Sequence, residues 1–258
     1  MFYVAAIPAM IILGLAKGGF GAIGVIVVPI IAIVISPVQA AGIVLPILVL
    51  SDLVGLVSYR KSFDRRTIAV FLPGAMIGIV IAWFAVSWVS EDMVRLIVGG
   101  IAIGFSVWFF VGRRIEEARP HHHGNATFWG TIAGFTSFFA HAGGPPFQVY
   151  AGPLKLEPRL FAGTMIYIFA AINAVKLVPF FLLGQFDSTN LATSAVLLPV
   201  SVPATLFGIW LVRRTRAETY YPVIYGLMMV VGVYLAGDAL LSFAGLSLED
   251  LPFIGGGA

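Results

Sequence analysis

The stretches of sequence that decide the fold are Lys17-Gly18-Gly19-Phe20-Gly21 and, after the midpoint, His141-Ala142-Gly143-Gly144-Pro145-Pro146. Each one interrupts a long hydrophobic segment with glycines and carries a side chain that can be positively charged. In membrane hydrocarbon, interrupted backbone is tolerated only where protein or a watery cavity satisfies its polar groups. A break of this kind that recurs in both halves of a chain indicates a transport site.

Composition defines the class of protein. Of the 258 residues, 60% are hydrophobic and only 10% are charged, and the mean hydropathy is +1.01, which is typical of an integral membrane protein. The 29 Gly and 15 Pro lie within apolar segments, as expected for closely packed or broken membrane helices. The net charge of +3 comes from short loops, so it reports topology and not a nucleic-acid partner. The absence of Cys excludes disulfides and thiolate metal sites.

Eight apolar segments follow one another along the chain, and six have the length of an ordinary transmembrane helix, about 20 residues. The first is too long for one straight span, because about 34 residues at about 1.5 Å each would reach about 50 Å across a core of about 30 Å. Its glycine break is where we expect it to fold back. The segments are 2–35, 39–58, 67–89, 93–112, 127–154, 160–183, 190–212 and 221–243.

Basic loops predict the topology. Lys and Arg gather at 60–66, 113–119 and 213–216, and such loops face the cytoplasm. Three apolar segments lie between the last two of these loops, and three full crossings would put the loops on opposite sides. One segment must therefore not cross. The segment 127–154, broken at His141, is the natural re-entrant hairpin.

The two halves also correspond in sequence. Pro37 precedes Asp52 by fifteen residues, and Pro158 precedes Asn173 by the same number. Equivalent loops differ in charge, because the loop at 60–66 is basic and its counterpart is not. They are therefore expected on opposite sides of the membrane, which is the mark of an inverted repeat. Further correspondences join Phe63-Asp64 to Phe186-Asp187 and the segment 73–78 to 203–208.

The predicted fold is an all-α polytopic membrane protein with two inverted-topology repeats, each a glycine-broken re-entrant hairpin followed by three transmembrane helices. The hairpin tips enter from opposite faces and meet near the midplane, so Lys17 and His141 approach one another. The predicted parts are an N-terminal repeat at 1–118, a basic and His-rich cytoplasmic loop at 119–126, a C-terminal repeat at 127–245 and a tail at 246–258.

Three motifs carry a resemblance to a known family. They are G-L-A-K-G-G-F-G-A-I-G at 14–24, S-P-V-Q-A-A at 36–41 and A-H-A-G-G-P-P-F-Q-V-Y at 140–150. Together they resemble the TauE/SafE sulfite exporter family, and the likeness covers nearly the whole chain. The resemblance implies export of sulfite or related organosulfur anions across a bacterial inner membrane.

Nearly all charged residues lie in loops, at helix ends or in the tail, and Lys17, Asp52 and Lys176 are the clearest exceptions. A charge at the bilayer centre costs about 2.5–3.5 kcal/mol on insertion scales, so each needs a partner or a cavity. Lys17 is predicted to bind the transported anion, or else to cap the broken helix. Asp52 is the candidate coupling group, with a structural ion pair as its alternative. Lys176 follows Asn173 by three residues on one helix face, as a polar lining or a structural pair.

His141 stands beside glycines that allow backbone amides to point at an anion. Its alternative role is a hydrogen bond to backbone that holds the hairpin tip. Gln148 offers a further donor, or a helix-packing hydrogen bond. The run His121-His122-His123 is interpreted as a solvated loop, and no metal or cofactor is predicted. The predicted substrate-binding residues are Lys17, Gly18, Gly19, His141, Gly143, Gly144, Gln148, Asn173 and Lys176.

The predicted function is that of a secondary transporter that exports a small anion, sulfite or an organosulfonate such as sulfoacetate, with a proton link through Asp52 or His141 as a hypothesis. A passive anion channel is the alternative. No catalytic-triad spacing, paired-His motif or phosphate loop is present, so an enzyme is not expected. The expected partners are the anion and membrane lipid; a homo-oligomer, the substrate's identity and the coupling ion are left open.

Overall fold

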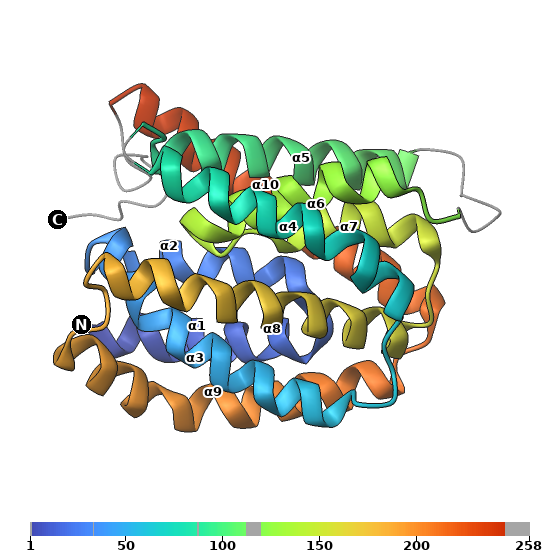
Figure 1. Ribbon diagram of the computed structural model, residues 1–258, viewed down its shortest axis with the longest axis horizontal. Coiled ribbons are helices and arrows are strands. Elements are labelled where there is room, and N and C mark those ends of the chain that lie inside the picture. Colours follow the sequence, from blue (N-terminus) through green and yellow to red (C-terminus); the bar gives the residue numbers. More distant parts are fainter. Residues whose placement is uncertain (1, 33, 87, 112–119, 246–258) are drawn as a thin grey trace, which may run out of the picture.

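The computed structural model describes residues 2–32, 34–86, 88–111 and 120–245, and all the regular structure in these ranges is helical (Figure 1). The predicted domain boundary at 118 and the tail at 246–258 lie outside the described residues. The elements are α1 (Phe2–Leu15), η1 (Ala16–Phe20), η2 (Gly21–Ile26), α2 (Val27–Ala32), α3 (Pro37–Ser58), α4 (Arg65–Ala85), α5 (Glu91–Val111), α6 (His123–Ala140), α7 (Gly144–Ala151), η3 (Gly152–Leu154), α8 (Pro158–Leu182), α9 (Ser188–Arg214) and α10 (Ala217–Phe243).

The first break reverses the chain. After α1 the helix widens into a π-helical turn, η1, and Gly19 has a φ of 140°, which a residue with a side chain rarely adopts. The tighter η2 follows, and α2 then packs back against α1. In Figure 1 the N-terminus and the end of α2 accordingly lie at the same end of the bundle.

The second break works differently. His141 ends α6 in the left-handed conformation with a φ of 51°, a position usually taken by glycine. The chain then turns at Gly143, and α7 begins at Gly144 with prolines in its first turn, where a missing N–H costs nothing. The helix α7 packs back on α6. A bent π-helix therefore makes the first reversal, whereas a helix stop and restart makes the second.

Matching capping groups start the long helices of the two halves. Proline opens both α3 and α8. Asp64 caps α4 by accepting hydrogen bonds from the N–H groups of Arg66 and Thr67. Asp187 caps α9 in the same way, through the N–H groups two and three residues further on. These caps satisfy N–H groups that a helix start leaves unpaired.

The helices pack in related pairs. The helix α4 lies along α6, as α9 lies along α1, and α5 lies along α10. Glycines bring the backbones together: a Cβ on Gly78 of α4 would fall 2.0 Å from the carbonyl oxygen of Thr131 on α6, and a Cβ on Gly18 would fall 2.4 Å from Gly208 Cα on α9. Such small-residue contacts are how membrane helices approach closely.

Hydrogen bonds show which loops share an end of the bundle. Arg213 at the end of α9 donates to the carbonyl of Ser58 at the end of α3, over 2.7 Å. At the opposite end, the hydroxyl of Ser242 in α10 donates to Asp92 in α5, also over 2.7 Å. The basic residues at 60–61, 65–66, 155 and 213–214 thus gather at one end, on the right in Figure 1.

Seven stretches of the described residues are long and apolar enough to cross a membrane, counting Phe2–Ala32 as one of them. Large apolar side chains also face outward along the helices, among them Val57, Phe84 and Phe181. A protein in water would bury such side chains, but lipid solvates them. The prediction of an all-α, multi-pass membrane protein is confirmed.

Candidate functional site

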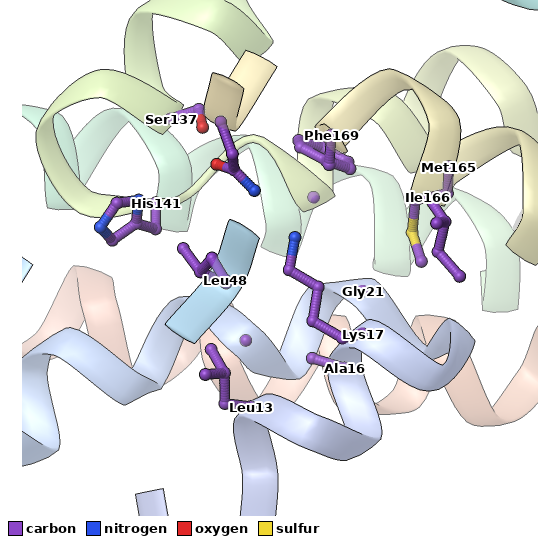
Figure 2. A pocket seen from close by; sticks show the side chains of 13 residues that line it. Leu13, Ala16, Lys17, Gly21, Leu48, Ser137, His141, Met165, Ile166 and Phe169 are labelled. Carbon is purple, nitrogen blue, oxygen red and sulfur yellow. The ribbon is translucent and has the colours of Figure 1, made fainter. Parts of the chain in front are cut away.

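A small cavity lies where the two breaks meet. Its volume is about 50 Å³, and its polar lining comes from Lys17, Ser137, His141 and Asn173. Figure 2 shows Lys17 reaching into it from η1, with Ser137 across the space and Phe169 to one side. A single water needs about 10–15 Å³ on this measure. The cavity therefore holds a few waters or an anion of about that size.

Lys17 and Asp52 form a buried ion pair at the cavity. The Lys17 Nζ lies 2.6 Å from Asp52 Oδ1, with the two side chains 11% and 2% exposed. The second carboxylate oxygen accepts a hydrogen bond of 2.7 Å from Asn173 Nδ2. Asp52 itself does not line the cavity. It lines an apolar groove between α3 and α8. An ammonium has three N–H donors, and no other hydrogen bond of Lys17 is found among the described residues, so two donors face the cavity.

Lys176 differs from Lys17 because its donors are already used. It is fully buried and points at the end of α6, where its Nζ lies 2.8 Å from Ser137 O, 3.1 Å from Ser137 Oγ and 2.6 Å from His141 Nδ1. A positive charge at a helix C-terminus is favourable, because the last carbonyls carry partial negative charge. Lys176 is therefore placed to hold the second break in position, and it does not line the cavity.

His141 has both ring nitrogens engaged. Its Nε2 lies 3.3 Å from the carbonyl oxygen of Ala41, and a carbonyl can only accept. Nε2 therefore carries the proton, and Nδ1 accepts from Lys176. The imidazole lines the cavity and holds the break against α3 through Ala41, so the hydrogen bond to backbone is present, and anion binding by His141 stays a prediction.

The predicted glycines divide into two groups. Gly144 lines the cavity, and a Cβ there would fall 2.9 Å from Gly21 O, so the two breaks touch each other. Gly18, Gly19 and Gly143 do not line the cavity but allow close contact with α9, α8 and Phe169. The start of α7 offers few backbone donors, because the two residues after Gly144 are prolines, which have no N–H.

Gln148 lies one turn further along α7 and outside the cavity lining. Its side chain is fully buried, and neither its Nε2 nor its Oε1 has a hydrogen-bond partner among the described residues. The predicted packing hydrogen bond is thus not formed by this amide. An unpaired buried amide is costly to stability.

Sequence reasoning missed several lining residues, and helical spacing was the signal for them. Met165 and Phe169 precede the predicted Asn173 by eight and four residues on α8, and all three line the same cavity, as expected for one helix face. Ser137 precedes His141 by four residues on α6 for the same reason. A spacing of four residues from His141 leads to Ser137, and the same spacing from Asn173 leads to Phe169 and Met165.

A second polar cluster lies at the basic end of the bundle. His121 Nε2 is 3.4 Å from Asp64 Oδ2, and its Nδ1 is 3.3 Å from the Tyr150 hydroxyl. Burial lowers the pKa of His121 below its usual value, although Asp64 opposes that shift. Burial would raise the pKa of Asp64, but hydrogen bonds from Thr67 and Arg66 outweigh it and lower that pKa. Within the described ranges, no group of three or more metal-ligating side chains occurs.

The fold and the cavity together define a class: a multi-pass helical membrane protein whose buried cationic site lies between broken helices, as in secondary transporters. The chain belongs to the TauE/SafE sulfite exporter family, because the model of the family described as "Sulfite exporter TauE/SafE" matches residues 6–235. This family membership makes the chain a membrane transporter, as the sequence predicted.

One curated relative supports the same assignment. The chain is 24% identical over 235 residues to a protein of Cupriavidus necator named "Probable sulfite/organosulfonate exporter TauE", covering 86% of this chain and 88% of the relative. No solved structure matches the chain.

Proposed function

We propose that the protein is a secondary transporter that exports a small organosulfur anion, sulfite or a compact organosulfonate, across a bacterial inner membrane. The observation that carries the proposal is the Lys17 ammonium, which lines the cavity between the two breaks with two donors unused. The name of the Cupriavidus relative supports the chemical class of the substrate. Sulfite has four heavy atoms, which suits a cavity of about 50 Å³.

The charges near the cavity suit a monovalent anion. With both lysines charged and Asp52 ionised, Lys17 and Lys176 contribute two positive charges and Asp52 one negative charge, while the hydrogen bonds of His141 fit a neutral imidazole. The sum is +1. An anion with one negative charge that binds together with one proton leaves this sum unchanged, so loading the site adds no net charge to the membrane interior.

Two inverted-topology repeats with re-entrant hairpins would supply the moving parts. Three observations support this proposal: the related packing of α4 on α6 and of α9 on α1, the caps of Asp64 and Asp187 at opposite ends of the bundle, and the hydrogen bond between the corresponding residues Asp52 and Asn173. Equivalent helices that meet near a common axis are typical of transporters that open alternately to each side.

Proton linkage follows from competition for Lys17. An ionised Asp52 takes one of its donors, and a bound anion competes for the same ammonium. Protonation of Asp52 releases Lys17 to the anion, so proton binding and anion binding reinforce each other, and this coupling is reciprocal. One proton would then travel with each anion in the same direction.

The experiment is sulfite efflux from proteoliposomes containing wild-type protein, Lys17→Ala or the control Lys61→Ala, whose lysine is exposed in a loop. Sulfoacetate is tested next. We expect saturable efflux that Lys17→Ala abolishes and Lys61→Ala retains. A pH gradient that is acidic inside the vesicles should drive this efflux. Efflux that does not saturate and ignores the pH gradient would instead indicate a passive channel. Wild-type protein that carries neither anion would overturn the proposed substrate class.

A further inference from the structure

We infer that Gln148 forms a second binding position, or station, for the anion, between the cavity and the basic end of the bundle. The Met165 side chain separates this station from the cavity. The inference rests on the proposed function for the kind of anion, but the station itself rests on the geometry of α7 and α8. It adds a step to the path of the substrate.

The first argument is the unpaired amide. Gln148 is fully buried, and both polar atoms of its side chain lack a partner among the described residues. Its backbone carbonyl, in contrast, accepts a hydrogen bond from Tyr225. Native proteins rarely leave a buried side-chain amide unsatisfied without a reason. Transient binding of an oxyanion would explain the unpaired amide, since its NH₂ group can donate two hydrogen bonds to that anion.

The second argument is the position of Gln148 beside the cavity wall. A Cβ built on Gly21 would fall 3.6 Å from Gln148 Nε2 and 2.3 Å from Met165 Sδ. Gly21 and Met165 both line the cavity. The amide of Gln148 therefore lies close to Gly21, a residue without a side chain, and to the flexible thioether of Met165, both in the cavity wall. Methionine changes conformation easily because it is unbranched, so Met165 fits the role of a movable partition.

The third argument is the direction of α7. Gln148 lies four residues beyond Gly144, which is about 6 Å along a helix, toward Lys155 and the basic end. An aromatic cluster adjoins Gln148: Phe147 packs on Phe161 at 5.3 Å between ring centroids, and Phe161 packs on Tyr220 at 5.9 Å. Gln148 is thus the polar group that an anion meets between this cluster and Lys17.

The chain contains no Cys, so a single introduced Cys reports access to its own position. We would label Gln148→Cys in detergent with the anionic reagent 2-sulfonatoethyl methanethiosulfonate. The matched control is Ile168→Cys, a fully buried position of α8 that does not line the cavity. We expect Gln148→Cys to react at least tenfold faster than the control and sulfoacetate to slow the reaction. A rate equal to that of Ile168→Cys, or no protection, would overturn the station.

A second variant guards against a folding artefact. Gln148→Met keeps the side-chain shape, and its stability should equal or exceed that of the wild type, because it removes an unpaired amide. We expect its sulfite efflux to fall about tenfold, the loss of one charge-assisted hydrogen bond. Wild-type efflux in Gln148→Met would overturn the inference. Protected labelling at position 148 in a protein that carries no sulfite or sulfoacetate would support the station while rejecting the proposed substrate.

Discussion

Removing first one charge and then both charges of the buried Lys17–Asp52 ion pair separates the structural role of Lys17 from its role in transport. In Lys17→Met, Asp52 keeps Asn173 as its hydrogen-bond partner but loses the ammonium 2.6 Å away. A buried charge that loses its partner typically costs about 3–5 kcal/mol. We expect the free energy of unfolding to fall by about that amount.

The double variant Lys17→Met/Asp52→Asn removes both charges and keeps a side chain that can pair with Asn173. Replacing a whole buried ion pair is often neutral or stabilising, so stability should return to within about 1 kcal/mol of the wild type, a margin set by one hydrogen bond. Transport should not return. An ammonium-to-anion hydrogen bond contributes about 1.5–3 kcal/mol, so sulfite efflux should stay about 10- to 150-fold below the wild-type rate.

The assay pairs reversible unfolding in mixed micelles with sulfite efflux from proteoliposomes for the wild type, both single variants and the double variant. Stability that recovers without transport supports the anion site. A double variant with wild-type efflux would refute the reasoning, because Lys17 would then serve the fold alone. A single Lys17→Met variant as stable as the wild type would show that the ion pair contributes nothing.

Three further predictions follow from contacts elsewhere in the bundle. Lys176→Met should lower the thermal unfolding midpoint strongly, because three hydrogen bonds at the end of α6 are lost, whereas Lys61→Met at an exposed position should not. Gly78→Ala should destabilise the protein by about 1–3 kcal/mol, as overpacking does, because its Cβ would meet backbone; Gly104→Ala, with open space around it, should leave the midpoint unchanged in the same melts. The lowered folded-state pKa of His121 means that the unfolded chain binds more protons as pH falls through the unfolded value of about 6.5. Acidification from pH 7 to 5 should thus destabilise the wild type more than His121→Gln, and equal pH profiles would contradict this.

Much of the architecture could be predicted because hydrophobic length, glycine breaks and basic loops act locally. The equal spacing from Pro37 to Asp52 and from Pro158 to Asn173 predicted equivalent positions, and the structure joins Asp52 to Asn173 by a hydrogen bond. The inverted relation of the halves itself stays a prediction.

The side-chain partners could not be predicted in the same way. Whether a buried lysine faces a cavity or the end of another helix depends on how the helices cross, which a single sequence does not encode locally. Lys17 and Lys176 therefore looked alike in the sequence, yet one has unused donors and the other has none. The unpaired amide of Gln148 was hidden for the same reason, since its neighbours come from η2 and α8.

Among the described residues, Asp52 is the one carboxylate hydrogen-bonded to side chains that line the cavity. In the proposed cycle, a lone carboxylate sets the stoichiometry at one proton for each anion. Transport of a monovalent anion would then move no net charge, and the membrane voltage would neither drive nor oppose it. At equilibrium the anion ratio across the membrane equals the inverse proton ratio, so one pH unit balances about a tenfold difference in anion, or about 1.4 kcal/mol. With an alkaline cytoplasm, such a protein would release the anion only after the ratio of internal to external anion exceeds the ratio that the pH difference sets.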